Sequence, residues 1–272
     1  MKFAGGIVLD IGAVARLEEA RQARSVASLS DVTEPIGGGF MCFGGPGAFV
    51  NQAMGLGFDG PVSDDGLNHL VEFYTSRGVE PKVELCPLAD DSLVKGLSAR
   101  GFVLRDFEHV LVRDLALDGS VPDLPGGIEI IDVRPDDEPM IRRLVEIALS
   151  GFPQPDPALF ERLVRRAVAA RGMKHFAARV DGQVAAIGGC EIEPPLGALF
   201  GMTTLPAFQR RGCQRALMIH RMRLLREHGC RYITVQTKPH VATGRNALRL
   251  GFQVAYTNAI VVQPAPGLAA SP

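Results

Sequence analysis

The sequence predicts an α/β (α+β) protein in which a mixed central sheet, flanked by helices, is built twice along the chain. First, apolar and β-branched runs alternate with segments of helical spacing, as in folds that pack helices on a sheet. Second, an ordered set of similar segments recurs at an interval of about 150 residues, which indicates a duplication. Third, a stretch rich in Pro, Gly and Asp separates two units, as is typical of a linker.

The second unit, predicted to span residues 128–263, carries the clearer pattern. Its strand at 128–133 alternates apolar and polar residues, and Asp181-Gly182 is a favoured two-residue hairpin turn. The predicted strands are 128–133, 175–180, 183–192, 199–205, 231–237 and 251–262, and the predicted helices are 136–150, 156–171, one beginning near Cys213, and 241–250. A linker at 116–127 precedes this unit, and a disordered tail is predicted at 264–272.

The first unit, predicted at 1–115, repeats part of this order. Gly78 follows a helix-like segment as Gly229 does, at an interval of 151 residues, and Gly101 precedes a strand-like run as Gly251 does, at an interval of 150 residues. The glycine-rich segment 37–47 resembles a nucleotide loop, but its glycines fit no phosphate-binding spacing. A strand with glycine-rich turns is the better interpretation.

Composition limits the functional class. With 272 residues, 46% hydrophobic and 22% charged, the chain is long enough for two domains with ample core. A net charge of −1 argues against nucleic acid or an anionic membrane as the main partner. The five cysteines are dispersed and match no metal-ligand spacing, and no apolar run approaches the ~20 residues that cross a bilayer. We therefore expect a cytoplasmic protein with no metal and no membrane association.

The most informative segment is Gln209-Arg210-Arg211-Gly212-Cys213-Gln214, which joins a strand-like run to an amphipathic helix. The start of a helix offers unpaired backbone N–H groups and partial positive charge. A glycine there permits close approach of an anion, and the neighbouring arginines add charge. The spacing is neither a Walker loop nor a dinucleotide fingerprint. The segment predicts a phosphate or pyrophosphate site; the alternative is a basic surface turn.

This hexapeptide resembles the Q/R-x-x-G-x-G/A acyl-CoA signature of the GNAT acetyltransferase superfamily, with Gln214 in place of the final small residue. The order strand, phosphate turn, helix, strand, helix, Gly-Phe, strand also resembles the GNAT core, and it covers residues 128–263. Arg245 and Asn246 ahead of Gly251-Phe252 resemble a segment of many bacterial members. The whole chain resembles tandem bacterial GNAT proteins with a degenerate first copy.

The resemblance implies a coenzyme A site. The pyrophosphate would meet the backbone N–H groups of residues 211–215, and pantetheine would lie along residues 202–204. Asn246 would sit across the pantetheine channel, although it equally fits a residue that cross-links helices, and the threonines also fit an ordinary strand. The predicted coenzyme-binding residues are Met202, Thr203, Thr204, Gln209, Arg210, Arg211, Gly212, Cys213, Gln214, Arg215 and Asn246.

Catalytic groups are harder to find. Many GNAT enzymes place an acidic tyrosine four residues before the Gly-Phe pair, where this chain has Ala247. A coenzyme A thiol leaves without a dedicated acid, because its pKa is low. For the base, Glu191 and Glu193 end a strand near the cleft, although a solvated strand end also explains them. The strand end at Thr204 would offer an N–H to the thioester oxygen.

The predicted function is therefore transfer of an acetyl group from acetyl-CoA to an amine of a small molecule or peptide. The alternative is a coenzyme-binding sensor or interaction module without catalysis, which Ala247 favours. In the first copy, Phe58–Ser63 stands where the phosphate turn should be, with Asp59 and Pro61 and no arginine, so no coenzyme is expected there. A monomer in which the first copy imitates a second subunit, or a homodimer, would follow.

Overall fold

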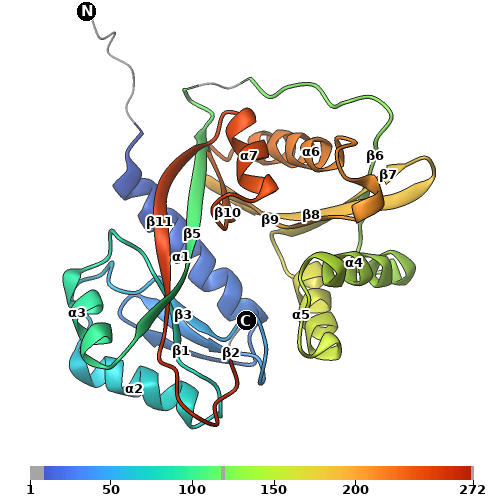
Figure 1. The fold of residues 1–272 in the computed structure, drawn as a ribbon. Helices are drawn as coiled ribbons and strands as arrows, with labels where there is room; N and C mark the ends of the chain where they lie inside the picture. The colour runs from blue at the N-terminus through green and yellow to red at the C-terminus, as the bar shows by residue number, and fades with distance from the viewer. Residues whose placement is uncertain (1–8, 118–119, 271–272) are drawn as a thin grey trace, which may run out of the picture.

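The computed structural model describes residues 9–117 and 120–270, and over them eleven strands form one mixed sheet flanked by helices (Figure 1). The predicted fold class is confirmed. The strands are β1 (Val32–Ile36), β2 (Gly39–Phe43), β3 (Gln52–Met54), β4 (Lys82–Leu85), β5 (Val103–Asp114), β6 (Glu129–Val133), β7 (Met173–Val180), β8 (Gln183–Glu193), β9 (Leu196–Thr204), β10 (Tyr232–Thr237) and β11 (Gln253–Val262). Their order in the sheet is β1-β2-β3-β4-β11-β5-β10-β9-β8-β7-β6.

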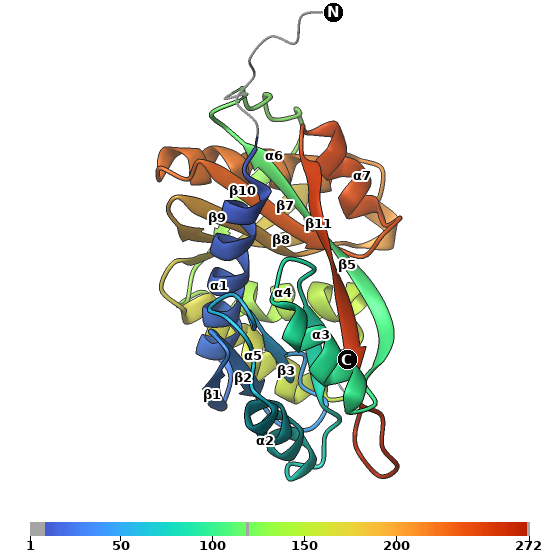
Figure 2. The ribbon, with the colours of Figure 1, turned by 90° about the vertical axis from the view of Figure 1, so that its left-hand side faces the viewer.

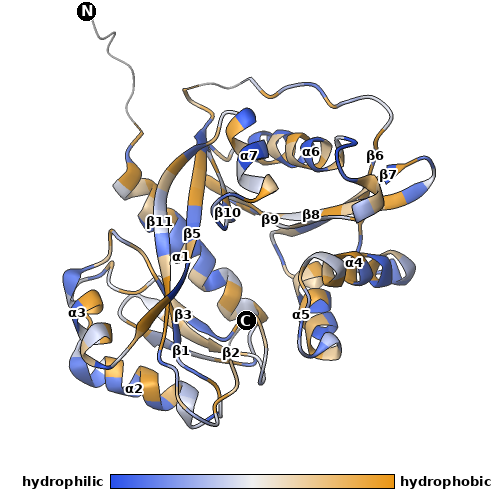
Figure 3. Ribbon diagram, viewed as in Figure 1, coloured by the Kyte–Doolittle hydropathy of each residue, from blue (hydrophilic) through white to orange (hydrophobic). Residues whose placement is uncertain are grey.

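The helices are α1 (Ile11–Leu29), α2 (Asp64–Thr75), α3 (Asp91–Ala99), α4 (Glu138–Gly151), α5 (Pro157–Ala169), α6 (Cys213–Glu227) and α7 (Ala242–Arg249), with a short 3-10 turn at Pro206–Phe208. Asp137 and Asp156 are the N-cap residues of α4 and α5. Their side chains accept hydrogen bonds from backbone N–H groups in the first turn of each helix. Orange and blue segments alternate along α2 and α4 in Figure 3, as amphipathic helices require.

The repeat predicted from the sequence appears as matching elements. β4 begins at Lys82 and β10 at Tyr232, an interval of 150 residues, and β5 and β11 begin at Val103 and Gln253, the same interval. In each half, a helix, a strand, a helix and a long strand follow in this order. The Gly-Phe pairs directly precede the two long strands, as expected.

The two halves exchange their last strands. β5 pairs with β10 and β11, whereas β11 pairs with β4 and β5, all antiparallel. One of the two neighbours of β10 thus comes from the first half of the sequence, and one of the two neighbours of β4 comes from the second half. Figures 1 and 2 show β5 and β11 running together between the two halves. The two predicted sheets are therefore one continuous sheet, and the site in one half borders a strand of the other.

The helices cover opposite faces of this sheet. Leu111 of β5 and Ile233 of β10 pack with Leu217 of α6 in one core cluster. On the other face, Val112 of β5 packs with Val14 of α1, and α4 packs on β8 and β9. A second large cluster fills the first half beneath α2 and α3. The sheet thus has an α6 face, which α6 and α7 cover, and an α1 face, which α1 and α4 cover.

The sequence patterns did not predict helix α1. Its buried residues include three charged ones, Glu18, Glu19 and Arg21, so its pattern is not that of an ordinary amphipathic helix. Glu19 accepts bonds from the Tyr256 hydroxyl at 2.8 Å and the Asn258 amide at 2.9 Å. These charged side chains are buried because they find partners in the folded sheet. They stand at positions where an amphipathic helix would have apolar residues, so the helical spacing of apolar residues is absent from the sequence of α1.

The segments at 116–127 and 264–272 are only partly described. Residues 116–117 and 120–127 lie outside helices and strands. In the tail, predicted to be disordered, the Ala269 backbone accepts a bond from the Glu80 N–H at 3.0 Å and donates one to Gly78 at 2.9 Å. The prediction was wrong over 264–270, because the tail pairs beside Val79; residues 271–272 lie outside the described residues.

Candidate functional site

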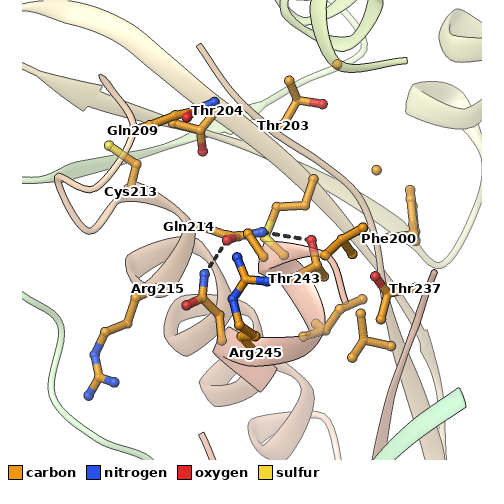
Figure 4. A pocket seen from close by; sticks show the side chains of 18 of the residues that line it. Phe200, Thr203, Thr204, Gln209, Cys213, Gln214, Arg215, Thr237, Thr243 and Arg245 are labelled. Atoms are coloured by element: carbon orange, nitrogen blue, oxygen red, sulfur yellow. Dashed lines mark hydrogen bonds between the residues drawn. The ribbon is translucent and has the colours of Figure 1, made fainter. Parts of the chain in front are cut away.

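A cavity of about 1060 Å³ lies between the carboxyl ends of β9 and β10 and the first turns of α6 and α7 (Figure 4). This volume is at the upper end of small-molecule sites. It is lined by Glu108, Gly151, Phe152, Leu199, Phe200, Gly201, Met202, Thr203, Thr204, Phe208, Gln209, Arg210, Gly212, Cys213, Gln214, Arg215, Val235, Gln236, Thr237, Lys238, Val241, Ala242, Thr243, Arg245, Asn246 and Arg249. Ten of the eleven predicted coenzyme-binding residues are among them; Arg211 is not.

Residues from both faces of the sheet line the cavity, which lies where the parallel strands β9 and β10 separate. β9 and β10 pair from Leu196↔Tyr232 to Leu199↔Val235 and no further, although β9 continues to Thr204 and β10 to Thr237. Beyond Leu199 and Val235, the backbone N–H and C=O groups of β9 and β10 that face each other do not pair across the gap. An extended chain with amide groups can hydrogen-bond to such an edge, as in strand addition.

The separation begins at an irregularity in β9. The register with β8 shifts between the pairs Ile187↔Thr203 and Gly189↔Phe200, and Gly201 has a φ of +59°. A positive φ is the conformation that glycine adopts without steric cost. The turn of the backbone at Gly201 therefore directs the end of β9 away from β10.

The fully buried Arg221 of α6 supports this irregularity. Its guanidinium donates to the carbonyl oxygens of Gly189 and Phe200, at 2.6 and 3.3 Å, and lies 2.9 Å from the Met202 sulfur. A Cβ at Gly188 would lie 2.8 Å from the guanidinium, so a glycine makes room for it. Burial lowers the pKa of Arg221 to about 10, which leaves the side chain charged at neutral pH. A charged donor thus fixes the carbonyls of β8 and β9 beside the cavity.

The turn at residues 209–212 leads directly into α6, which begins at Cys213 as the sequence predicted. Gly212 is the N-cap of α6, with a φ of +84° and no side-chain cap on the helix, and Arg210 also has a positive φ of +61°. The backbone N–H groups of the first turn, at Cys213 to Arg215, precede the first intrahelical acceptor. Four arginines border the cavity: Arg210, Arg215, Arg245 and Arg249. This end of the cavity suits a polyanion.

Arg211 differs from the expectation. Its guanidinium bonds to the Asp181 carboxylate at 2.6 Å and lies 5.5 Å from the centre of the Phe208 ring. The side chain therefore points away from the cavity, although its backbone belongs to the turn. Asp181 is a residue of the hairpin turn between β7 and β8, which no local pattern connects to residue 211.

Gln214 and Asn246 join the two helix starts. Gln214 donates to the Thr243 hydroxyl at 2.9 Å and accepts a bond from the Asn246 amide (Figure 4). Both side chains also line the cavity. Asn246 therefore lines the cavity and also cross-links the two helices. The larger Gln214, in place of a small residue, forms the cross-link.

The predicted bases lie elsewhere. Glu191 forms a buried ion pair with Arg21, and Glu193 pairs with Arg24, both on α1. Neither carboxylate lines the cavity. The expectation that one of them faces the cleft was wrong, because α1 covers that strand end, and α1 was not predicted. Thr204, by contrast, lies at the cavity as expected.

No tyrosine lines the cavity within the described ranges. Ala247 is fully buried in the core beneath α7, the Tyr256 hydroxyl bonds to Glu19, and Tyr232 stacks under Arg231. The absence of a tyrosine acid at Ala247 thus is not offset by another tyrosine of the described chain.

Sequence reasoning missed the contribution of the first half. Glu108 of β5 and Phe152, which follows α4, both line the cavity. Burial raises the pKa of the Glu108 carboxyl, against the opposing effect of Lys82 and Lys238. Glu108 is the one carboxylate among the lining residues that the structure describes. Its position follows from the strand exchange, for which the sequence carries no local signal.

The corresponding turn of the first half has a different chemistry. Ser63 caps α2 with its own hydroxyl, which accepts the Gly66 N–H at 3.1 Å, and the first turn carries Asp64 and Asp65. A side-chain cap and two carboxylates replace the free N–H groups and arginines found at α6. Gly60, which precedes Pro61, has a positive φ, and Arg16 of α1 donates to the Phe58 carbonyl oxygen of this turn at 2.7 Å.

Comparison with known proteins agrees with this geometry. Residues 141–252 match the model of the Acetyltransferase (GNAT) family. A GCN5-related N-acetyltransferase from Kribbella flavida has a similar structure over 98% of this chain and 99% of that one, with a TM-score of 0.65 and 18% identity.

A tandem GNAT protein from the clavulanic acid biosynthesis pathway is similar over 95% of this chain and 88% of that one, with a TM-score of 0.60 and 13% identity. At these identities the likeness shows the fold, here the tandem GNAT arrangement. A comparison with curated protein sequences gave no match. Among the described residues, no helix is long and apolar enough to span a membrane, and no cluster of His, Cys, Asp or Glu has the arrangement of a metal site.

Proposed function

We propose that the second half binds acetyl-CoA in the cavity and transfers its acetyl group to an amine of a small molecule or a peptide. The observation that carries the proposal is the alignment of three features in one cavity: a helix start with an αL glycine, a rim of arginines, and two separated strands. The pyrophosphate would meet the N–H groups of residues 213–215, where positive charge is concentrated.

The remaining part of the coenzyme fits the separated strands. Pantetheine carries two amide groups, and the edge of β9 at residues 200–204 offers backbone partners that β10 does not use. An N–H near Thr204 would stabilise negative charge on the thioester oxygen as the amine attacks. Coenzyme A supplies the activated acyl group; the residues of this chain bind it, orient it and hold the amine.

A second function is favoured by one observation. Ala247 is buried in the core, so the position of the usual acid carries no proton donor. A coenzyme-binding module without transfer would need the same cavity. The two functions differ only in turnover, since both require the coenzyme.

A binding and a turnover experiment test the proposal separately. Calorimetry of the full chain with acetyl-CoA should give one site, and a thiol-release assay with a panel of primary alkylamines and peptides should show amine-dependent release. Binding without amine-dependent release for any acceptor would favour the binding module. No binding of acetyl-CoA or CoA would contradict both functions.

A further inference from the structure

The exchanged strand β5 brings a carboxylate of the first half into the cavity of the second half. We propose that Glu108 binds the ammonium group of the acceptor and takes its proton. The acceptor is then a primary aliphatic amine, which is charged at neutral pH, rather than an aromatic amine. This inference rests on the proposed acetyl transfer and adds the base and the acceptor class to it.

The position of Glu108 follows from the strand register. His109 pairs with Thr237, the last residue of β10, so Glu108 lies just beyond the end of β10. This is where β10 and β9 have separated. Both Glu108 and Thr237 line the cavity. A nucleophile held by Glu108 is therefore next to the gap in the sheet.

The side chain of Glu108 faces away from the phosphate turn. On β5, Leu111 packs into the core under α6, whereas Val110 and Val112 pack on the α1 side. Because successive strand residues point to opposite faces, Glu108 shares the α1 face with Val110. The α6 face carries the arginines, and the α1 face carries the carboxylate. The acyl donor and the amine would thus arrive from opposite faces and meet in the gap.

The surroundings of Glu108 favour a cation. Phe152 and Phe200, which line the cavity, come from the end of α4 and from β9, and Phe200 packs with Leu163 and Leu29 on the α1 side. Aromatic faces and a partly desolvated carboxylate together hold an alkylammonium group well. Glu108 lines the cavity, and among the described residues its carboxylate interacts electrostatically with Lys82 and Lys238.

The charges near Glu108 set its proton affinity. Burial raises the pKa of Glu108, Asp106 raises it further, and the ammonium groups of Lys82 and Lys238 lower it. Lys238 is itself paired with Asp106. The charged groups that face Glu108 are Lys82 and Glu84 of β4, Asp106 of β5 and Lys238 after β10. Asn258, which pairs with Glu108 across the sheet, also donates a hydrogen bond to Glu19 of α1. A carboxylate with a raised pKa is a better base near neutrality.

The proposed step balances in atoms and charge. The Glu108 carboxylate takes one proton from the ammonium group, and the freed nitrogen lone pair forms a bond to the thioester carbonyl carbon. The carbon–sulfur bond then breaks, and the thiolate receives the second proton of the nitrogen. The products are an N-alkylacetamide, the free thiol and a neutral Glu108, which returns its proton to water.

The first test uses binding alone and needs no known acceptor. S-(2-aminoethyl)-CoA places an ammonium group three bonds from the sulfur, and S-propyl-CoA is its neutral match. We expect the full chain to bind the aminoethyl probe at least tenfold more tightly than the propyl probe by calorimetry. In Glu108→Gln this preference should disappear, whereas the affinity for CoA should change less than twofold. Glu72→Gln, on the exposed side of α2, is the charge-matched control.

The outcomes separate the two levels of the argument. Wild-type protein that binds none of the three ligands contradicts the proposed function and this inference with it. Equal preference for the aminoethyl probe in wild type and in Glu108→Gln overturns the inference alone, since the coenzyme site is then intact.

Turnover gives a second readout that a structural role would not move. With a primary alkylamine, Glu108→Gln should lose ~100-fold or more in kcat/KM near pH 7. The loss should shrink as pH rises and the free amine becomes abundant, and Glu108→Asp should recover part of the rate. A loss that is the same at every pH would assign Glu108 a structural role.

Discussion

Gly212 offers the most direct test of the phosphate turn, because its conformation can be matched elsewhere in the molecule. It starts α6 with a φ of +84°. Gly229, which follows α6, has a φ of +83° and no heavy atom within 4 Å of an added Cβ. At Gly212 an added Cβ would lie 3.6 Å from Ile128 Cδ1, an ordinary contact. The two glycines therefore have the same backbone conformation but different surroundings, so an L-residue at either position meets the same strain.

Replacing either glycine by alanine should have a similar effect on stability. An L-residue in the left-handed region costs about 1–2 kcal/mol. For a chain of this size, each kcal/mol lowers Tm by about 2–4 °C. We expect Gly212→Ala and Gly229→Ala to lower Tm by comparable amounts in a calorimetric scan, with both variants folded.

The affinity for acetyl-CoA should separate the variants. In Gly212→Ala the added Cβ and the relaxation of the turn move the N–H groups of residues 213–215 from a bound phosphate. Loss of one charge-assisted hydrogen bond is worth about 1.5–3 kcal/mol, or a 10- to 150-fold loss of affinity. Gly229→Ala should bind within about twofold of wild type. Equal affinities of the two variants in isothermal titration would refute the assignment of the turn as the phosphate site.

Two further predictions concern the first half and pH. Calorimetry with CoA should give one equivalent per chain, because Ser63 and two aspartates occupy the start of α2; a second equivalent would contradict this interpretation. The folded-state pKa of Glu19 is raised from 4.5 to about 7, chiefly by burial, so the folded chain holds this proton more tightly than the unfolded chain. Stability should then be greatest below pH 4.5 for this group and fall as pH rises through about 7, by ~3 kcal/mol at about 1.4 kcal/mol per pKa unit. Glu19→Gln should flatten that decline in urea unfolding at a series of pH values, and an unchanged slope would show that another group is responsible.

Much of the site could be predicted from local sequence. Gly212, the arginines beside it and the helix that begins at Cys213 occur within a few residues of one another. Helix starts, hairpin turns and Gly-Phe strand openings depend on nearest neighbours in the chain, so residue type and spacing carry their signal. The turn at Asp181-Gly182 and the strand ending at Val262 were predicted for the same reason.

The sequence by itself thus determined the fold class, the repeated order of elements and the glycine turn that starts α6. The tertiary structure decided which strands are neighbours: it exchanged β5 and β11, placed Glu108 in the cavity, and covered Glu191 with α1. The physical reason is that strand pairing joins residues more than a hundred positions apart, and two similar halves offer nearly equivalent partners for each long strand. Buried charged residues such as Glu19 find their partners only once these strands are paired. The sequence therefore shows no spacing pattern that marks them as buried.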